Sequence, residues 1–311
     1  MYSIFIDGRN GTTGLRIAER LAQRCDIQLL TLSEEKRKDP AARREILNAC
    51  DVALLCLPDD AAREAVAMIE NPSVRVLDTS TAHRTAPGWV YGFPELSAEQ
   101  RAKILESKRI AVPGCHASGF IALVAPLVRA GILPKDALLS CHSITGYSGG
   151  GKKMIAEYEA EGRSIQLDAP RQYGLPQSHK HLPEMQALTG LSSEPIFCPI
   201  VSDFYSGMVV TVPLFKEQLA AGCAVSDIES AYKAAYTGPV VVVDDVSASG
   251  FLAGNAAANT DRMHICVQGN DERILLTAAY DNLGKGASGA AVQLLNLILG
   301  ANETEGLEGI L

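Results

Sequence analysis

The stretch Ile4-Phe5-Ile6-Asp7-Gly8-Arg9-Asn10-Gly11-Thr12-Thr13-Gly14 decides the fold expected for the first half of this 311-residue chain. Its apolar run, 4–6, fits a short buried β-strand, and the apolar side chains of residues 15–24 fall on one face of a helix. Glycines recur at every third position between them. This order is a variant of the dinucleotide-binding fingerprint, because glycines let the backbone approach a pyrophosphate at a helix N-terminus.

The glycine loop supplies the first candidate cofactor-binding residues. Either of its two threonines is placed to cap the helix or to bond a phosphate. The candidates are Gly8, Asn10, Gly11, Thr12, Thr13 and Gly14.

The tip of the second expected strand, residues 27–32, bears on the choice of cofactor. In such folds an acidic side chain there bonds the ribose 2′-OH of NAD, whereas a basic one accepts the 2′-phosphate of NADP. The tip reads Ser33-Glu34-Glu35-Lys36-Arg37-Lys38, so both signs of charge are present. Ser33 in the first position, with Arg37 close behind, favours NADP; a solvated charged loop is the alternative interpretation.

Strands and helices alternate over the first 112 residues. Further strands are expected at 51–58, 74–78 and 109–112, with helices at 41–50, at 61–67 and near 97–106. Alternation of this kind predicts a doubly wound α/β fold, in which parallel strands end at one shared edge where ligands bind. We therefore expect Pro58 and Ser80, which follow two of these strands, to lie near the cofactor.

A cysteine follows the strand at 109–112 after a sharp Pro113-Gly114 turn. The residues behind it begin a helix, so Cys115 is expected at or near a helix N-terminus, where backbone N–H groups and the macrodipole favour a thiolate. His116 would add to the positive field if it were protonated. The sequence thus predicts a nucleophile at Cys115; a buried, inert cysteine is the alternative.

The pattern of apolar residues changes beyond residue 120. An apolar helix at 121–130 is followed by longer strand-like runs, which predict an antiparallel or mixed sheet in an α+β domain. The last helix, 286–299, is so apolar that it must be buried, and we expect it to pack back onto the first domain. The strand-like runs are 137–144, 196–201, 208–213, 240–243, 263–267 and 273–280.

Three motifs of the second half carry candidate chemistry. The run 146–153 offers an anion cradle of glycines with Ser148, Gly149, Lys152 and Lys153. In the run 178–184, His179 and His181 would point the same way if the segment is extended, so that either could serve a thiolate while Glu184 fixes its tautomer. The run 281–289 offers Asn282 to a carboxamide and Lys285 to an anion. Exposed polar loops are the alternative for all three.

Composition excludes several classes of protein. A net charge of −8 argues against nucleic acid and anionic membranes as partners. The eight cysteines form no CxxC pair and, with the histidines, no zinc-ligand spacing, so we expect neither a disulfide framework nor a metal. No signal peptide or membrane span is expected, which predicts a cytoplasmic protein.

Taken together, the motifs resemble those of the N-acetyl-γ-glutamyl-phosphate reductases of arginine biosynthesis, in their shorter form. The resemblance rests on the glycine loop at 8–14, Val-Pro-Gly-Cys at 112–115, His-x-His-x-Pro-Glu at 179–184 and Asn-Leu-x-Lys-Gly-Ala at 282–287. It implies a Rossmann-type domain, 1–114 plus 285–311, with an inserted catalytic and oligomerisation domain at 115–284. It also implies a homo-oligomer, whether homodimer or homotetramer.

The resemblance implies reductive dephosphorylation of an acyl phosphate with NADPH, through a thioester on Cys115. His181 or His179 would move the proton, and Arg84 would join Lys152 and Lys153 in binding the substrate carboxylate and the inorganic phosphate that leaves. Specificity for the N-acetyl group follows from the resemblance alone. An acyl-phosphate reductase like aspartate-semialdehyde dehydrogenase, and a non-catalytic dinucleotide sensor, are the alternatives.

Overall fold

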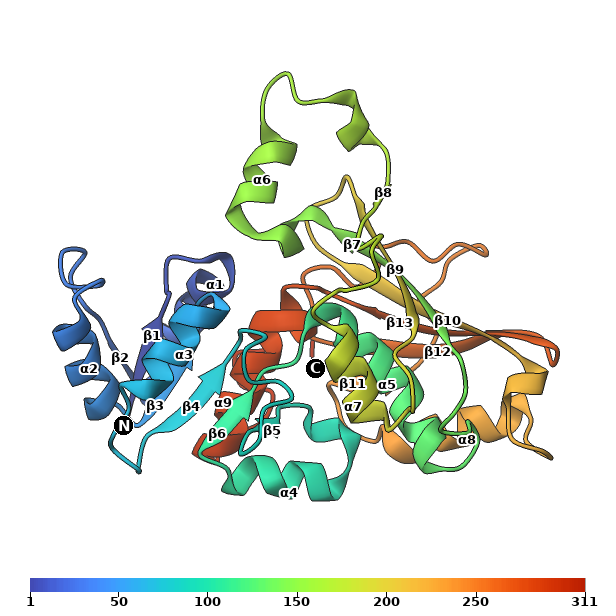
Figure 1. Cartoon of the computed structure of the whole chain (residues 1–311), viewed down its shortest axis with the longest axis horizontal. Helices are drawn as coiled ribbons and strands as arrows, with labels where there is room; N and C mark the ends of the chain where they lie inside the picture. Colours follow the sequence, from blue (N-terminus) through green and yellow to red (C-terminus); the bar gives the residue numbers. More distant parts are fainter. Residues whose placement is uncertain (311) are drawn as a thin grey trace. The chain divides into compact units, whose positions relative to one another are not determined.

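The computed structural model describes residues 1–310, and its internal contacts divide the chain into two compact units. Unit 1 contains residues 1–94, 99–113 and 287–306; unit 2 contains 95–98, 114–286 and 307–310. In Figure 1, unit 1 therefore combines the blue and cyan elements with the red helix α9. Within residues 1–310, none of the helices has both the length and the apolar character needed to span a bilayer.

The sheet of unit 1 is fully parallel, which confirms the predicted doubly wound α/β fold. Its strand order is β2-β1-β3-β4-β6-β5. The two-residue β5 was not predicted, since so short a strand leaves no periodic signal. The strands are β1 (Tyr2–Asp7), β2 (Ile27–Leu30), β3 (Val52–Leu55), β4 (Arg75–Asp78), β5 (Val90–Tyr91) and β6 (Arg109–Ala111).

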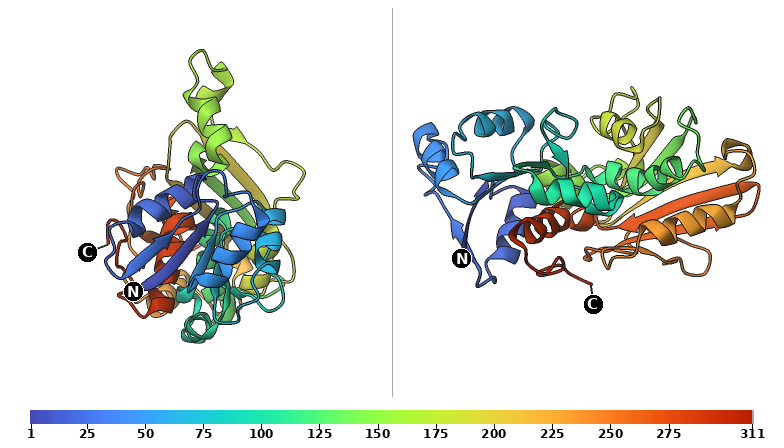
Figure 2. Two further views of the ribbon diagram at one scale, coloured as in Figure 1. Left: turned by 90° about the vertical axis from the view of Figure 1, so that its left-hand side faces the viewer. Right: turned by 90° about the horizontal axis from the view of Figure 1, so that it is seen from below.

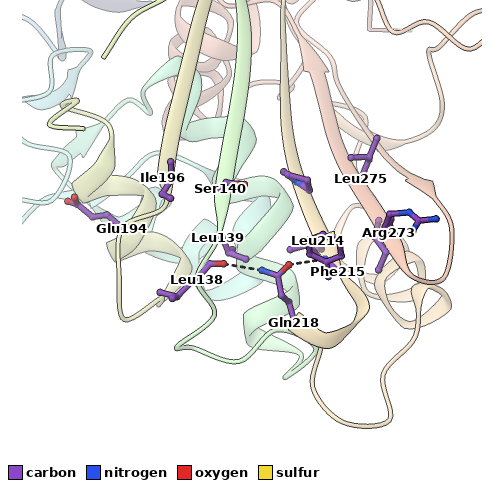
Figure 3. Close-up of a pocket in the computed structure, with 12 residues that line it drawn as sticks. Leu138, Leu139, Ser140, Glu194, Ile196, Leu214, Phe215, Gln218, Arg273 and Leu275 are labelled. Atoms are coloured by element: carbon purple, nitrogen blue, oxygen red, sulfur yellow. Dashed lines mark hydrogen bonds between the residues drawn. The ribbon is translucent and has the colours of Figure 1, made fainter. Parts of the chain in front are cut away.

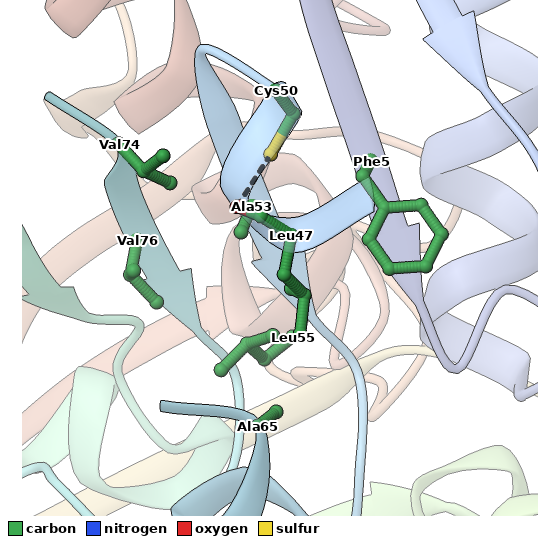
Figure 4. Packing of buried hydrophobic residues seen from close by; sticks show 8 residues of the cluster. All are labelled: Phe5, Leu47, Cys50, Ala53, Leu55, Ala65, Val74 and Val76. Carbon is green, nitrogen blue, oxygen red and sulfur yellow. Dashed lines mark hydrogen bonds between the residues drawn. The ribbon is translucent and has the colours of Figure 1, made fainter. Parts of the chain in front are cut away.

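Helices pack against both faces of this sheet, as the left view of Figure 2 shows for the blue strands. On one face, α2 and α3 enclose a cluster of apolar side chains that includes Leu47 and Val76, both fully buried (Figure 4). Helix α9 contacts β4 and α1. Burial raises the pKa of the Cys50 thiol in this cluster to about 11, so Cys50 is inert at neutral pH. The helices are α1 (Thr12–Leu21), α2 (Pro40–Ala49), α3 (Asp59–Ala67), α4 (Ala98–Glu106) and α9 (Gly289–Leu299).

Helix α9 is buried in unit 1 as expected, but it begins three residues later than predicted. Residues Gly284–Ser288 form a π-helical turn, and the α-helix starts at Gly289. The wider turn places Gly286 so close to Cys115 that a Cβ added there would lie 3.1 Å from the Cys115 Cβ.

Unit 2 holds a mixed seven-stranded sheet, in agreement with the predicted α+β domain. The strand order is β11-β12-β13-β10-β7-β9-β8, with parallel pairing for β7–β9 and β11–β12 and antiparallel pairing elsewhere. The strands are β7 (Ser140–Gly146), β8 (Arg171–Gln172), β9 (Ile196–Ser202), β10 (Met208–Phe215), β11 (Val241–Val243), β12 (Met263–Gly269) and β13 (Arg273–Tyr280).

The helices of unit 2 include α5 (Cys115–Arg129), α6 (Gly151–Glu159), α7 (Leu182–Thr189) and α8 (Val225–Ala235). Helix α5 is central to them, because it contacts β10, β13, α7 and α8, and all its residues from His116 to Val128 are buried. Helix α6 and the short 3-10 turn Ile165–Asp168 form an arm, drawn in light green in Figure 1. Tyr158 and Leu167 of this arm pack in a small apolar cluster with Val201 of β9.

Buried tyrosine hydroxyls complete the backbone hydrogen bonding of α5. Pro126 lies inside this helix and has no N–H, so it cannot donate to the carbonyl of Ala122 four residues before it. The Tyr236 hydroxyl donates to the Ala122 carbonyl at 2.6 Å and takes the place of the missing donor. The Tyr232 hydroxyl donates to the next carbonyl, that of Leu123, at 2.6 Å. That carbonyl faces Leu127, which does carry an N–H.

We predict that Tyr236→Phe lowers the free energy of unfolding by about 1–3 kcal/mol, because it leaves the Ala122 carbonyl buried without its donor. Tyr232→Phe is the matched control and should cost less, since Leu123 keeps the helical donor. Urea denaturation of both variants measures the difference. Equal losses, or a larger loss for Tyr232→Phe, would refute the role given to Pro126.

Candidate active site

Cys115 is the first residue of helix α5. Gly114 is the N-cap, with φ −75° and ψ 141°, and no side chain caps the helix. The N–H groups of the first turn have no partner within the helix, so they favour negative charge on a side chain or ligand placed there. The turn Pro113-Gly114 therefore gives the Cys115 thiol the position in which a thiolate is stabilised.

A buried carboxylate holds this turn. The Gly114 N–H donates to Glu184 Oε2 at 3.1 Å, and the Glu184 side chain is only 1% exposed. Glu184 lies in the first turn of α7, and α7 packs on α5. A charged group in such a place is retained only with strong partners. Glu184 thus ties the start of α5 to the segment that carries the paired histidines.

Glu184 also faces His181. Its Oε1 lies 3.9 Å from His181 Nε2, which is too long for a hydrogen bond. His181 is 4% exposed and forms the N-cap of α7. The predicted hydrogen bond to Glu184 that would fix the tautomer of this ring is therefore not formed at this distance.

The two histidines of the motif lie side by side, in a turn rather than in an extended segment. Residues 179–182 form a turn, in which Leu182 N–H donates to the His179 carbonyl at 3.0 Å. His179 Nδ1 accepts the His181 backbone N–H at 3.2 Å. The rings meet edge to face, with centroids 4.7 Å apart. His179 therefore braces the backbone of His181.

His116 does not add positive charge beside Cys115, so that expectation is wrong. Burial, reinforced by His179, lowers the pKa of His116 to about 3, and the ring is neutral at pH 7. Its Nδ1 lies 2.7 Å from Ser143 Oγ, and its Nε2 lies 2.7 Å from the Tyr173 hydroxyl. The sequence placed His116 next to the thiol but carried no sign that the ring is buried.

The neutral His116 predicts a pH dependence of stability. Because folding lowers the pKa of His116, the unfolded chain protonates this ring below about pH 6.5, whereas the folded chain does so only near pH 3. The free energy of unfolding should therefore decrease as the pH is lowered through this window, by roughly 1.4 kcal/mol per pH unit for this residue. Urea denaturation between pH 7 and pH 4.5 should show a smaller loss for His116→Asn than for the wild type. Equal losses would contradict the assignment.

The loop 146–150 and Asn282 lie together. Asn282 Nδ2 donates to Ser148 Oγ at 3.0 Å, and Asn282 Oδ1 accepts the Gly207 N–H at 2.9 Å. A Cβ added at Gly149 would lie 3.4 Å from Asn282 Nδ2. The structure thus joins two of the predicted motifs, while Lys152 and Lys153 are exposed on α6.

Lys285 is held by a partner that the sequence did not indicate. Its side chain is 1% exposed, and its ammonium nitrogen lies 2.8 and 2.9 Å from the two carboxylate oxygens of Glu95. The pair balances the charge of Lys285, and its predicted contact with a cofactor stays a prediction.

Unit 1 contains a cleft of about 770 Å³ around the glycine loop. Gly8 has φ +87°, and a Cβ there would lie 2.2 Å from the Cys56 carbonyl oxygen, so only glycine fits. Of the predicted cofactor residues, Gly8, Asn10, Gly11, Arg37 and Pro58 line the cleft. Thr12 and Thr13 start α1 and do not cap it, because the N-cap is Gly11.

The cleft is rich in cations. Arg43, which the sequence did not single out, pairs with Asp7 at 2.7 Å, and Asn10 donates to Glu34 at 3.2 Å. Arg37 lies 3.0 Å from Glu34, and the Arg37 backbone N–H donates to the Ser33 carbonyl at 3.0 Å. The shape of the cleft, the exposed backbone of its glycine loop and its cationic side chains fit a dinucleotide that carries an additional phosphate.

Ser80 and Arg84 lie in a tight group after β4. The Ser80 hydroxyl donates to Asp78 Oδ2 at 2.6 Å, and His83 Nδ1 lies 2.6 Å from the same oxygen. Arg84 donates to the carbonyls of Val112 and Thr79, at 3.0 and 3.1 Å. Both residues thus brace the ends of β4 and β6, and their ligand contacts stay predictions. Across residues 1–310, no group of three or more His, Cys, Asp or Glu side chains is arranged for a metal ion.

Comparison with known proteins defines the class. Residues 3–104 match the family model "Semialdehyde dehydrogenase, NAD binding domain", and residues 115–282 match "Semialdehyde dehydrogenase, dimerisation domain". Solved aspartate semialdehyde dehydrogenases share the fold. The Francisella tularensis enzyme gives a TM-score of 0.72 at 13% identity, covering 96% of this chain and 100% of that one. Aspartate semialdehyde dehydrogenase II of Vibrio cholerae gives a TM-score of 0.71 at 18% identity, covering 96% of this chain and 99% of that one. The chain is a semialdehyde dehydrogenase-type protein.

Curated relatives narrow the class to one family. N-acetyl-gamma-glutamyl-phosphate reductase 2 of Pseudomonas putida is 47% identical over 309 residues, 97% of this chain and 98% of the relative. N-acetyl-gamma-glutamyl-phosphate reductase of Chelativorans sp. is 48% identical over 306 residues, 95% of this chain and 97% of the relative. The chain therefore belongs to the N-acetyl-γ-glutamyl-phosphate reductase family.

Proposed function

We propose that this protein reduces N-acetyl-γ-glutamyl phosphate to N-acetylglutamate semialdehyde and phosphate, with NADPH, in arginine biosynthesis. Family membership supports the substrate. The observation that carries the chemistry is the position of Cys115 at the first residue of α5, next to a turn held by Glu184.

The Cys115 thiolate attacks the acyl carbon of the substrate, the bond to the phosphate oxygen breaks, and inorganic phosphate leaves. The product is a thioester on Cys115. A thiolate suits this step because it is both a good nucleophile and a good leaving group at neutral pH. Bound NADPH supplies the hydride that reduces the thioester carbon. The resulting hemithioacetal loses the thiolate and gives the aldehyde.

His181 is our candidate for the acid that protonates the hemithioacetal oxygen and the base that takes this proton back. Glu184 lies 3.9 Å from its Nε2 and also holds the Gly114 turn, so one carboxylate aligns the nucleophile and the acid/base. His179 is engaged in bracing His181. The N–H groups at the start of α5 would bind the oxyanion.

The anionic ends of the substrate need cations. Arg84, Lys152 and Lys153 are the candidates for the phosphate and the carboxylate, with Ser148 and Gly149 offering polar groups of the same loop. The exposed ammonium groups of Lys152 and Lys153 and the bond between Ser148 and Asn282 support an anion site built on this loop.

NADP is the cofactor we propose in preference to NAD. The cleft of unit 1 is lined by Arg9, Arg37, Lys38 and Arg43 against Asp7 and Glu34. Asp7 is already paired with Arg43, and Glu34 with Arg37. Neither carboxylate is left to bind a ribose hydroxyl by itself, while the excess of cations suits a 2′-phosphate.

The eight free cysteines support a reducing compartment such as the cytoplasm.

A reverse assay tests the proposed function. N-acetylglutamate semialdehyde, phosphate and NADP⁺ should give turnover, whereas aspartate semialdehyde or NAD⁺ should give little. Cys115→Ser should lose activity by about 10³-fold or more, because an alcohol is a poor nucleophile at neutral pH. The variant should still bind NADPH, as fluorescence titration would show. Turnover by Cys115→Ser, or preference for aspartate semialdehyde, would refute the proposal.

We further propose that the protein is a homo-oligomer built on the open face of the unit 2 sheet. Apolar side chains crowd this face around a pocket of about 560 Å³ between β9 and β13 (Figure 3). Leu138, Ile196 and Phe215 are 78%, 63% and 62% exposed. Apolar exposure of this extent marks a protein interface, and the matched dimerisation-domain family supports a second copy as its occupant.

Light scattering coupled to size-exclusion chromatography tests this interface. The wild type should have the mass of a dimer or tetramer, and Phe215→Asp should shift it toward smaller species, because a buried unpaired charge is costly. Ile165→Asp is the control, since Ile165 is 82% exposed but lies on the arm rather than on this face. A monomeric wild type, or an unchanged mass for Phe215→Asp, would contradict the assignment.

A further inference from the structure

The Tyr280 hydroxyl connects two backbone groups in the first turn of the nucleophile's helix. It donates to the Cys115 carbonyl oxygen and accepts the Gly119 N–H at 3.0 Å. In an α-helix, the carbonyl of residue i and the N–H of residue i+4 normally bond to each other. Tyr280 therefore contacts both ends of the helical hydrogen bond that begins at Cys115.

Packing fixes this hydroxyl in place. Tyr280 is the last residue of β13, is fully buried, and pairs in register with Met208 of β10. A Cβ added at Gly119 would lie 2.7 Å from the Tyr280 oxygen and 2.7 Å from Val210 Cγ2. Glycine at 119 is thus what lets α5 approach the sheet closely enough for the hydroxyl to reach both groups.

The hydroxyl is always present as a donor. Burial, and after it the charge of Cys115, raises the pKa of Tyr280 well above its usual value, so the side chain stays neutral and protonated. A neutral donor can hold the Cys115 carbonyl without adding a charge that would repel a thiolate. The N–H of Gly114, the residue before Cys115, donates to Glu184.

We propose that Tyr280 is a positioning residue of the reaction, which sets the geometry of the first turn of α5 and thereby the reactivity of the Cys115 thiol. The proposal rests on the proposed function, in which Cys115 is the nucleophile. Tyr280 acts through the backbone: it determines where the thiol and the N–H groups around it stand. A small displacement of such a turn weakens both thiolate stabilisation and attack on the acyl carbon.

The chain offers a matched control. Tyr232 is also fully buried, and its hydroxyl also donates to a carbonyl of α5, that of Leu123. Tyr232→Phe and Tyr280→Phe both remove one buried hydroxyl from the same helix. They differ in distance along the helix from Cys115, so a loss of stability alone would affect both, whereas a positioning role would affect only Tyr280.

The experiment measures two quantities on the full-length protein. The first is the rate at which iodoacetamide alkylates Cys115, followed by mass spectrometry of the Cys115 peptide from pH 5 to pH 10. The second is kcat and KM in the reverse assay. Tyr280→Phe should move the midpoint of the alkylation profile to higher pH and lower kcat about 10- to 100-fold, with KM for NADP⁺ unchanged. Tyr232→Phe should leave both readouts at wild-type values.

Gly119→Ala supplies a second variant in which the tyrosine is intact. Its Cβ would displace the Tyr280 hydroxyl, so it should shift the alkylation profile in the same direction. A wild-type profile and kcat for Tyr280→Phe, or equal changes in Tyr232→Phe, would overturn the proposal. If Cys115→Ser retained turnover, the proposed function would fail. The alkylation profiles of the wild type and of Tyr280→Phe would still show whether Tyr280 controls the reactivity of the Cys115 thiol.

Discussion

The hydrogen bond from the Gly114 N–H to the buried Glu184 carboxylate is the interaction on which the candidate site depends. It joins α5 to α7, and so it brings the Cys115 turn and the histidine motif into one structure. Because the carboxylate is almost fully buried, losing the N–H partner would leave a charge poorly solvated. The same carboxylate lies 3.9 Å from His181, so the positions of Cys115 and His181 are not independent of each other.

Much of the fold was predictable, for physical reasons. In residues 1–112, the strands β1, β3 and β4 are short runs rich in apolar residues, and α1 has a clear apolar face, whereas the two-residue β5 gives no such signal. The Pro113-Gly114 turn likewise indicated a helix start at Cys115. Thr12 and Thr13 show the limit of this local reasoning, because the helix begins one residue earlier than a threonine cap requires.

The contacts that complete the site could not be predicted from the sequence. Gly114 and Glu184 are separated by 70 residues, and Tyr280 lies 165 residues from Cys115. The pairing of Lys285 with Glu95 is as remote. Spacing in the sequence does not show which residues so far apart in the chain make contact. Nor does it show which side chains are buried, and burial decides their protonation. It is burial that makes His116 neutral and that fixes Tyr280 as a permanent donor.

Trapping the thioester tests the central claim most directly. The protein is mixed with N-acetylglutamate semialdehyde and NADP⁺ in the absence of phosphate, so that the acyl group has no acceptor but water. The account predicts a burst of NADPH equal to about one per chain, since the acyl-enzyme accumulates, together with the acyl mass on the peptide that contains Cys115. A burst without acylation of Cys115, or acylation of another cysteine in an active enzyme, would contradict it.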